Sequence, residues 1–279
     1  MFSMNRLSLQ GRVRIIGCLT EGMSLRATAR LVDVSLNTVT KLLVDVGTAC
    51  DLYQNETLRN LLCKKIQCDE IWTFTGMKES SVPKAKRGQV GLGDTYTWVA
   101  IDADSKLVVS WQVGKRDAHH GQKFMNDVAG RLANRITLST DGHHTYVNAV
   151  EGAFGGNVDF GMLLKVYGPA TGPSAERRYS PPEVIGTVKR RISGEPSYKD
   201  ISTSYVERQN LTMRMGMRRY TRLTNGFSRK IQNHACAVAL HYMHYNFGRI
   251  HKTLRVTPAM QTGISDHVWT LEEIAKLAE

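Results

Sequence analysis

Cysteine is scarce in this 279-residue chain, and its few cysteines are not arranged in pairs. There are five, they are scattered, and no two of them form a CxxC pattern. An odd number without regular spacing favours reduced thiols over a disulfide framework or a structural zinc site. We therefore expect a cytoplasmic protein rather than a secreted one.

Long hydrophobic runs are also missing. No apolar run approaches the ~20 residues that a membrane-spanning helix needs. The N-terminal stretch has Arg12 and Arg14 inside its apolar part, where a secretory signal would not tolerate them. The sequence thus predicts a protein that has no membrane partner.

Acidic residues are few where basic residues gather. The chain carries 37 Lys and Arg against 25 Asp and Glu, a net charge of +12 with a pI near 9.6. Between residues 203 and 258, ten Lys and Arg accompany Glu207 alone, and residues 1–65 have nine basic and five acidic side chains. A solvated basic face is seldom this one-sided, so we interpret the first region as a track for phosphates. DNA is the expected partner.

Residues 1–48 predict three short helices. Ser24 and Ser35 are candidate N-caps of the second and third helix, and the short connection between those helices is typical of a helix-turn-helix. Asp33 lies in the turn, where a left-handed backbone is common. Val39 is expected to face the core, which leaves four side chains for a DNA groove: Asn37, Thr38, Thr40 and Lys41. A plain helical hairpin without DNA contact is the alternative.

The rest of the chain predicts a mixed α/β domain. Residues 49–63 read as a helical linker, and three consecutive strands follow it, then helix, strand, helix and strand, then two long helices. This order is typical of helices packed on a sheet. We expect the domain to span residues 64–265, with a C-terminal helix over 266–279.

Two aspartates stand out because they lie in predicted strands. Asp69 is surrounded by β-forming residues, and Asp141 ends the strand "ITLST". Strand interiors disfavour Asp, so each of these acids needs a partner or a metal ion. Glu70 follows Asp69 and is expected to point to the opposite face of the sheet, outside the site. Glu207 is the third candidate acid, although Ser204-x-x-Glu207 also fits a helix capping box.

Three carboxylates without His or Cys suit Mg²⁺ or Mn²⁺. Two such ions ~3.5–4 Å apart can activate the attacking oxygen and stabilise the leaving oxygen at a phosphodiester. Trp72 and Trp98 lie in strands that look buried, so we expect them in the core rather than against bases. Contacts with DNA are predicted for the polar and basic residues that follow Glu207: Asn210, Arg214, Arg218, Arg219, Arg222 and Lys230.

Three sequence blocks resemble those of insertion-sequence-1 family transposases: "CDEIWTFTG", "STDGHHTY" and "STSYVERQNLTMRMGMRRYTRLTNGFSRK". The tail "HYMHYNFGRIHKTLRVTPAMQTG" is similar to that of integrase-like transposases. The resemblance implies a DDE enzyme whose ribonuclease-H-like core is a mixed sheet flanked by helices. It implies that Asp69, Asp141 and Glu207 bind the metal ions and that Arg214 is the basic residue seven positions after the Glu. It also implies a homo-oligomer on DNA, since two element ends must be paired.

Two features depart from the family's pattern. Compact members have the last acid closer to the second, whereas here Glu207 follows Asp141 by 66 residues. About forty residues, within roughly 155–200, therefore look like an expansion. Many members also have an N-terminal zinc finger, which this chain lacks, so the predicted helix-turn-helix would recognise the element ends alone.

The predicted function is that of a DNA transposase. It would cleave transposon ends in a Mg²⁺-dependent reaction and transfer the freed 3′-OH into target DNA. The main alternative is a non-catalytic DNA-binding regulator or a decayed transposase, which would show no metal dependence. Another alternative is a structure-specific nuclease of the same fold, which would cut DNA but would not join ends.

Overall fold

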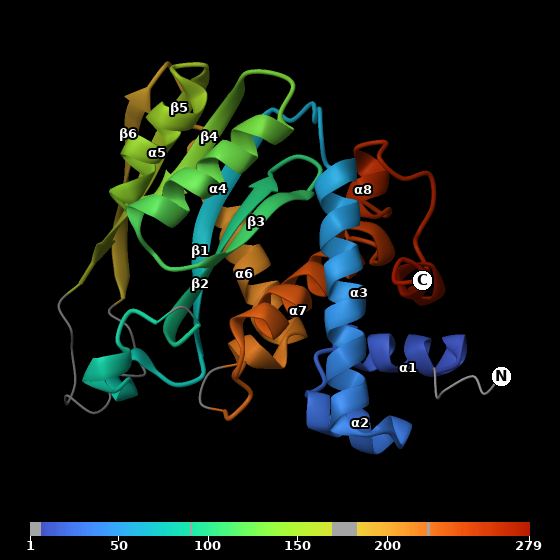
Figure 1. The fold of residues 1–279 in the computed structure, drawn as a ribbon. Coiled ribbons are helices and arrows are strands. Elements are labelled where there is room, and N and C mark those ends of the chain that lie inside the picture. The colour runs from blue at the N-terminus through green and yellow to red at the C-terminus, as the bar shows by residue number, and fades with distance from the viewer. Residues whose placement is uncertain (1–6, 90, 169–182, 222–223) are drawn as a thin grey trace.

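A computed structural model describes residues 7–89, 91–168, 183–221 and 224–279. At its centre is a six-stranded mixed sheet in the order β3-β2-β1-β4-β5-β6 (Figure 1). β2 is antiparallel to β1, and β3 is antiparallel to β2. On the other side of β1, the strands β4 and β5 are parallel to it, and β6 is antiparallel to β5. The strands are β1 (Lys65–Thr75), β2 (Gly93–Asp102), β3 (Val108–Gly114), β4 (Ile136–Asp141), β5 (Val158–Tyr167) and β6 (Val184–Ser193).

The predicted mixed α/β class is confirmed, and the arrangement is consistent with the ribonuclease-H-like sheet that the resemblance implies. α4 (Ala118–Arg131) and α5 (Thr145–Phe154) cover one face of the sheet, and α6 (Ser204–Gly216) lies on the other (Figure 1). Trp98 is fully buried under the first pair of helices, as expected, with its ring 5.8 Å from that of Phe124 and 5.5 Å from that of Tyr146.

The N-terminal helices form where their caps predict them. They are α1 (Leu9–Thr20), α2 (Leu25–Val32) and α3 (Leu36–Thr57). The Ser24 and Ser35 side chains accept the predicted capping bonds, and Asp33 adopts the left-handed conformation with φ 53°. That these helices bind DNA stays a prediction.

α3 continues across the expected boundary between the first domain and the linker, and it packs along α7 (Ile231–Met243). Gly47 allows the close approach, because a Cβ at this position would lie 2.4 Å from the carbonyl oxygen of Cys236. The chain after α7 forms one π-helical turn, then α8 (Pro258–Gln261) and α9 (Leu271–Lys276). α9 is shorter than the helix expected over 266–279, because Thr270 and Glu273 form a capping box that starts it.

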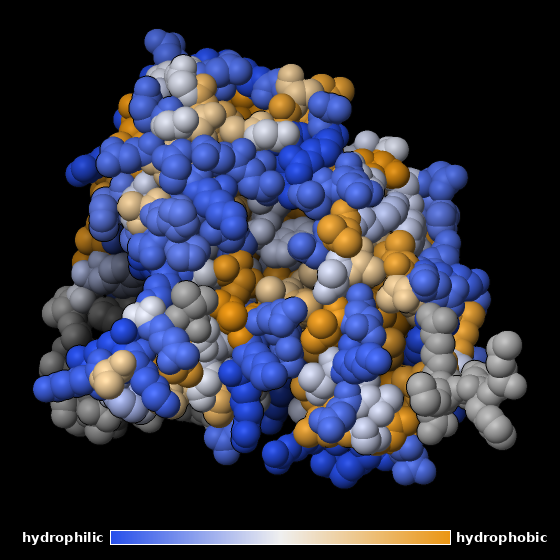
Figure 2. All heavy atoms as spheres, viewed as in Figure 1, coloured by the Kyte–Doolittle hydropathy of each residue, from blue (hydrophilic) through white to orange (hydrophobic). Residues whose placement is uncertain are grey.

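The expanded segment contains one strand that the sequence did not predict. β6 forms the edge of the sheet, and most of its side chains are exposed. Hydrophilic side chains cover most of the face seen in Figure 2, and hydrophobic ones show chiefly in patches toward the middle of the view. Within the described ranges, no helix is both long enough and apolar enough to cross a membrane.

Candidate active site

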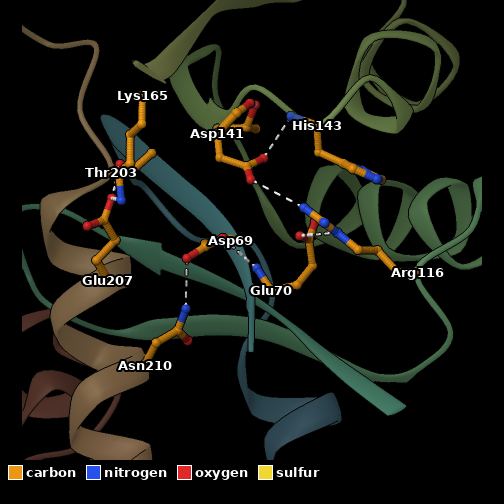
Figure 3. Close-up of polar contacts among 10 residues, drawn as sticks. Asp69, Glu70, Arg116, Asp141, His143, Lys165, Thr203, Glu207 and Asn210 are labelled. Carbon is orange, nitrogen blue, oxygen red and sulfur yellow. Dashed lines mark hydrogen bonds and ion pairs between the residues drawn. The ribbon is translucent and has the colours of Figure 1, made fainter. Parts of the chain in front are cut away.

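Three carboxylates converge where β4 ends beside β1 (Figure 3). Asp69 and Glu70 belong to β1, and Asp141 is the last residue of β4. One oxygen from each lies within 4.8 Å of the others. The parallel pairing of Cys68 with Thr140 explains the convergence, since the next residue on each strand is an aspartate. Strand ends of this kind are where ligands gather in α/β sheets.

The prediction that Glu70 stays outside the site is wrong. Alternation does send the two neighbours to different faces, because Asp69 contacts Asn210 on α6 while Glu70 contacts Arg116. Asp141, however, is the last residue of β4. Beyond it no backbone of β4 stands between the two faces of the sheet. The longer Glu70 side chain reaches Asp141 past this end, and it is only 1 % exposed.

Arg116 links two of the three acids, and sequence reasoning missed it. Its Nε donates to Glu70 Oε2 at 3.0 Å, and its terminal nitrogen donates to Asp141 Oδ2 at 3.3 Å. The other Asp141 oxygen accepts the backbone N–H of His143 at 3.0 Å. No local pattern could have signalled Arg116, because its partners lie 46 and 25 residues away in the sequence.

One oxygen of Glu70 makes no well-formed hydrogen bond to a described residue. Glu70 Oε1 is buried and accepts no hydrogen bond of normal geometry within the described part of the chain. The Tyr146 hydroxyl lies close enough to lower the pKa of Glu70, but it does not meet hydrogen-bond geometry. Glu70 Oε1 is thus a poorly paired buried acceptor, and a cation at this oxygen would satisfy it.

Burial and the nearby charge of Asp141 make Asp69 and Glu70 reluctant to ionise. Burial first, and then the charge of Asp141, raise the pKa of Asp69 to about 6. The same two causes raise the pKa of Glu70 to about 7. The Glu70 backbone N–H, which donates to Asp69 Oδ1 at 2.8 Å, offsets only part of the rise in the pKa of Asp69. A bound cation would relieve the repulsion.

Glu207 lies at the edge of this cluster rather than inside it. Its Oε1 accepts the Thr203 hydroxyl at 2.5 Å and pairs with Lys165 Nζ at 2.9 Å. Its charge still raises the pKa of Asp69, so the two carboxylates are within electrostatic range. The structure does not bring Glu207 to ligand distance of the other acids. Its role as a metal ligand stays a prediction.

The expected capping box at Ser204–Glu207 is absent, and a different residue starts the helix. Gln67 Oε1 accepts the backbone N–H of Tyr205 at 2.8 Å and that of Val206 at 3.3 Å. Gln67 lies two residues before Asp69 on the same face of β1, so the strand that carries Asp69 also fixes where α6 begins. This contact places Glu207 beside the cluster.

Asn210 has a partner other than the predicted DNA. It is 4 % exposed, and its amide nitrogen donates to Asp69 Oδ2 at 2.9 Å. Together with the Glu70 backbone N–H, it holds both oxygens of Asp69 in place. The structure therefore makes Asn210 a positioning residue for Asp69.

The predicted basic track is not one continuous helix. α6 ends at Gly216, and the Tyr220 hydroxyl turns the chain inward by bonding to His234 Nε2 at 2.9 Å. Arg219 points inward too, donating to Ser228 Oγ at 2.8 Å, and its burial lowers its pKa to about 10. Phosphate contact stays a prediction for the other basic residues of this region. Arg214 is half-buried, Arg218 and Lys230 are exposed, and Arg222 lies outside the described residues.

The four predicted groove residues on α3 differ in availability. Asn37 and Lys41 are exposed. The Thr38 hydroxyl shares a 2.8 Å hydrogen bond with the N-cap serine, and the Thr40 hydroxyl donates to a carbonyl one turn earlier at 2.8 Å. Val39 is fully buried, as expected. Asn37 and Lys41 are the more available pair for a DNA contact.

Trp72 is not the core residue that was expected. It is 37 % exposed. β4 pairs with β1 only as far as Cys68, so β1 has lost that neighbour by the time it reaches Trp72. The apolar pattern of the strand does not reveal where its neighbour stops.

Comparison with known proteins gives no family assignment. No family model and no curated protein matches the chain. Among solved structures, "Mos1 transposase paired-end complex with left transposon end" has a TM-score of 0.23 at 12 % identity, covering 57 % of this chain and 60 % of that one. "Crystal structure of the Mos1 Strand Transfer Complex" has a TM-score of 0.24 at 12 % identity, covering 88 % and 79 %. Values this low do not establish a shared fold, so function must be argued from the site.

Proposed function

We propose that this protein is a DDE-class DNA transposase, a metal-dependent polynucleotidyl transferase with a ribonuclease-H-like core. The observation that carries the proposal is the convergence of Asp69, Glu70 and Asp141, which each bring one oxygen within 4.8 Å of the others. The three sequence blocks that resemble the insertion-sequence-1 family contribute β1, the end of β4 and α6, which are the elements around this site.

The donor set fits a hard divalent cation, because every available ligand is a carboxylate oxygen. Asp69, Glu70 and Asp141 would hold it, with Glu207 close by. Arg116 and Lys165 are the cations paired with these acids. Four carboxylates and two cations leave two negative charges, which one Mg²⁺ or Mn²⁺ balances. A second ion would depend on charge brought by substrate phosphates.

The cation would activate the attacking oxygen and stabilise the leaving oxygen of a phosphodiester. The protein's own side chains orient the ligands. Asn210 fixes Asp69, Arg116 fixes Glu70 and Asp141, and Lys165 holds Glu207 at the margin of the site. Such supporting contacts set ligand orientation and are commonly as necessary as the ligands.

DNA binding follows from charge and from exposed cations. The net charge of +12 attracts a polyanion. We assign residues 1–48 to recognition of the element ends, chiefly through Asn37 and Lys41, and residues 64–265 to catalysis. Arg218 and Lys230 are exposed near the catalytic domain's helices and would contact the DNA backbone. Pairing of two ends would require a homo-oligomer.

A joining assay tests the proposal and separates its alternatives. The substrates are duplexes from the DNA on either side of the coding sequence, intact or pre-cut to expose a 3′-OH, together with a plasmid target. With Mg²⁺ or Mn²⁺ we expect nicking of the intact end and joining of the pre-cut end to the plasmid, and neither reaction in EDTA. Nicking without joining would indicate a nuclease instead. DNA binding with neither reaction would indicate a regulator or a decayed enzyme.

A further inference from the structure

An aromatic surface lies next to the acid cluster on β1. Trp72 follows Glu70 by two residues, so both side chains project from the same face of the strand. The Trp72 ring lies 6.0 Å from that of Phe74, which lies 4.7 Å from that of Phe227. We call Trp72, Phe74 and Phe227 the aromatic ledge. Trp72 is its most accessible member at 37 %, and both phenylalanines are half-buried.

The ledge stands on a part of β1 that has only one full neighbour. Beyond Cys68, β1 pairs with β2 alone until a single bridge joins Thr75 to Ser228. Single exposed apolar side chains are common on protein surfaces, but a large indole exposed two residues from a polar site is typical of a binding surface.

Basic side chains lie on the chain segments that adjoin this ledge. The connection from β1 to β2 has four exposed cations and one acid, Glu79, which accepts the backbone N–H of Asp94 at 3.1 Å. The chain around Ser228 lies against this connection, since Gly76 donates its N–H to the Ser228 carbonyl at 2.8 Å. The exposed cations at this end of β1 are Lys78, Lys84, Lys86, Arg87, Arg229 and Lys230.

A further cation lies on the side of the acid cluster. Arg116 lies 5.9 Å above the ring of Tyr96, which pairs with Trp72 across the two strands. The aromatic surface is thus placed between the Arg116 guanidinium and the basic β1–β2 connection. Aromatic faces flanked by cations are how proteins bind unpaired nucleic acid, with rings stacking on bases and cations on phosphates.

We propose that the aromatic ledge stacks an unpaired nucleobase of the DNA strand whose phosphate lies at the acid cluster. The inference rests on the proposed function and specifies its substrate. Two residues of β-strand separate Trp72 from Glu70 by about 7 Å, which is about two base steps of B-DNA. The stacked base therefore belongs to a nucleotide about one or two positions from the scissile phosphate. DNA with unpaired bases at this position is the preferred substrate.

Charge favours DNA over a second copy of the chain as the occupant. Each copy has a net charge of +12, so two basic surfaces meeting at the ledge would repel each other. The same cations attract a polyanion and strengthen its binding. The ledge is therefore assigned to nucleic acid, and self-association through it is an outcome that the test below can detect.

Binding in EDTA tests the inference without requiring cleavage. Two duplexes are compared, one fully paired and one with unpaired 2-aminopurine beside the cleavage position, by anisotropy and by 2-aminopurine fluorescence. For Trp72→Ala we expect about tenfold or more weaker binding of the unpaired substrate and loss of the fluorescence quenching. Binding of the paired duplex should change less than about twofold. Trp72→Phe should restore much of both signals. Trp269→Phe, at a ring that packs against Tyr53 and Phe247, is the matched control for Trp72→Phe.

Several results would overturn the inference. Equal loss of binding to both duplexes would mean that Trp72 supports the fold rather than a base, and melting curves of the variant check this. Unchanged binding of the unpaired substrate would remove Trp72 from recognition. Self-association of the wild type that disappears in Trp72→Ala would assign the ledge to a second copy. Missing cleavage in Mg²⁺ would overturn the proposed function instead, and it would leave these binding results standing.

Discussion

Replacing Asp69 by asparagine is expected to reduce metal-dependent cleavage at least about a thousandfold while DNA binding persists. In the proposed site Asp69 would supply a ligand oxygen and a negative charge at the centre of the cluster, where Asn210 and the Glu70 backbone hold it. Metal catalysis supplies several kcal/mol, and each ~1.4 kcal/mol corresponds to tenfold in rate. Asparagine keeps the shape of the side chain, so the fold and the basic surfaces remain.

The comparison requires nicking rates and DNA affinities from the same preparations. Asp104→Asn makes the same chemical change on an exposed turn and should behave like the wild type in both measurements. Nicking by Asp69→Asn within about tenfold of the wild-type rate would show that this acid does not hold the ion. Loss of DNA affinity along with nicking would indicate a folding defect, which a melting curve would reveal.

The contribution of Asp69 and Glu70 to metal-free stability is expected to fall as the pH rises from about 5 to about 8. The pKa of Asp69 is raised from 3.8 to about 6, and that of Glu70 from 4.5 to about 7, mainly by burial. These two acids therefore bind more protons in the folded state than in the unfolded state, and their contribution to the free energy of unfolding decreases with pH until both are ionised. Buried His234 and His241 act in the opposite direction, because burial lowers their pKa values to about 3. Each shift corresponds to at most about 3 kcal/mol, and their coupling makes the total less than the sum.

Mg²⁺ or Mn²⁺ at pH 8 is expected to restore this lost stability, because the cation binds the ionised acids of the folded state. Glu70→Gln should raise the metal-free stability at pH 8 by about 1–3 kcal/mol relative to the wild type, change it less at pH 5 and abolish most of the stabilisation by metal. The amide oxygen can still accept the Arg116 hydrogen bond. Urea unfolding at pH 5 and pH 8, in EDTA and in Mg²⁺, measures all of these effects. Glu151→Gln on the exposed side of α5 is the matched control, and a stability difference between Glu70→Gln and the wild type that is equal at both pH values in EDTA would contradict the account.

Local patterns predicted most of the fold. The β2–β3 hairpin, α4, β4, α5 and β5 form where alternation and helical spacing place them, because burial on one face leaves a clear signal. Ser24 and Ser35 were identifiable because a cap acts on amides two or three residues away. β6 was missed because an exposed edge strand buries neither face consistently, so its residues show no alternation.

The site was predictable only in part. Asp69 and Asp141 were found because an acid inside a strand is unusual, and their pairing follows from the strand register. Glu70 was excluded because direction along a strand was considered without side-chain length and without the end of β4. The contacts of Arg116 depend on tertiary structure and leave no local trace.

The start of α6 and the exposure of Trp72 also depend on residues that are distant in the sequence. α6 is fixed by Gln67, whose contacts with the helix span 138 and 139 residues of sequence. Trp72 is exposed because β4 stops pairing with β1 after Cys68, which the β1 sequence does not encode. Features set by a distant neighbour could not be read from the residues around them.

Anomalous diffraction from crystals soaked in Mn²⁺ tests the central claim most directly. The account predicts one anomalous peak in the free protein, coordinated by carboxylate oxygens of Asp69, Glu70 and Asp141, with a second peak only when DNA is bound. No peak at these three residues under saturating Mn²⁺, with Arg116 still bridging Glu70 and Asp141, would contradict it.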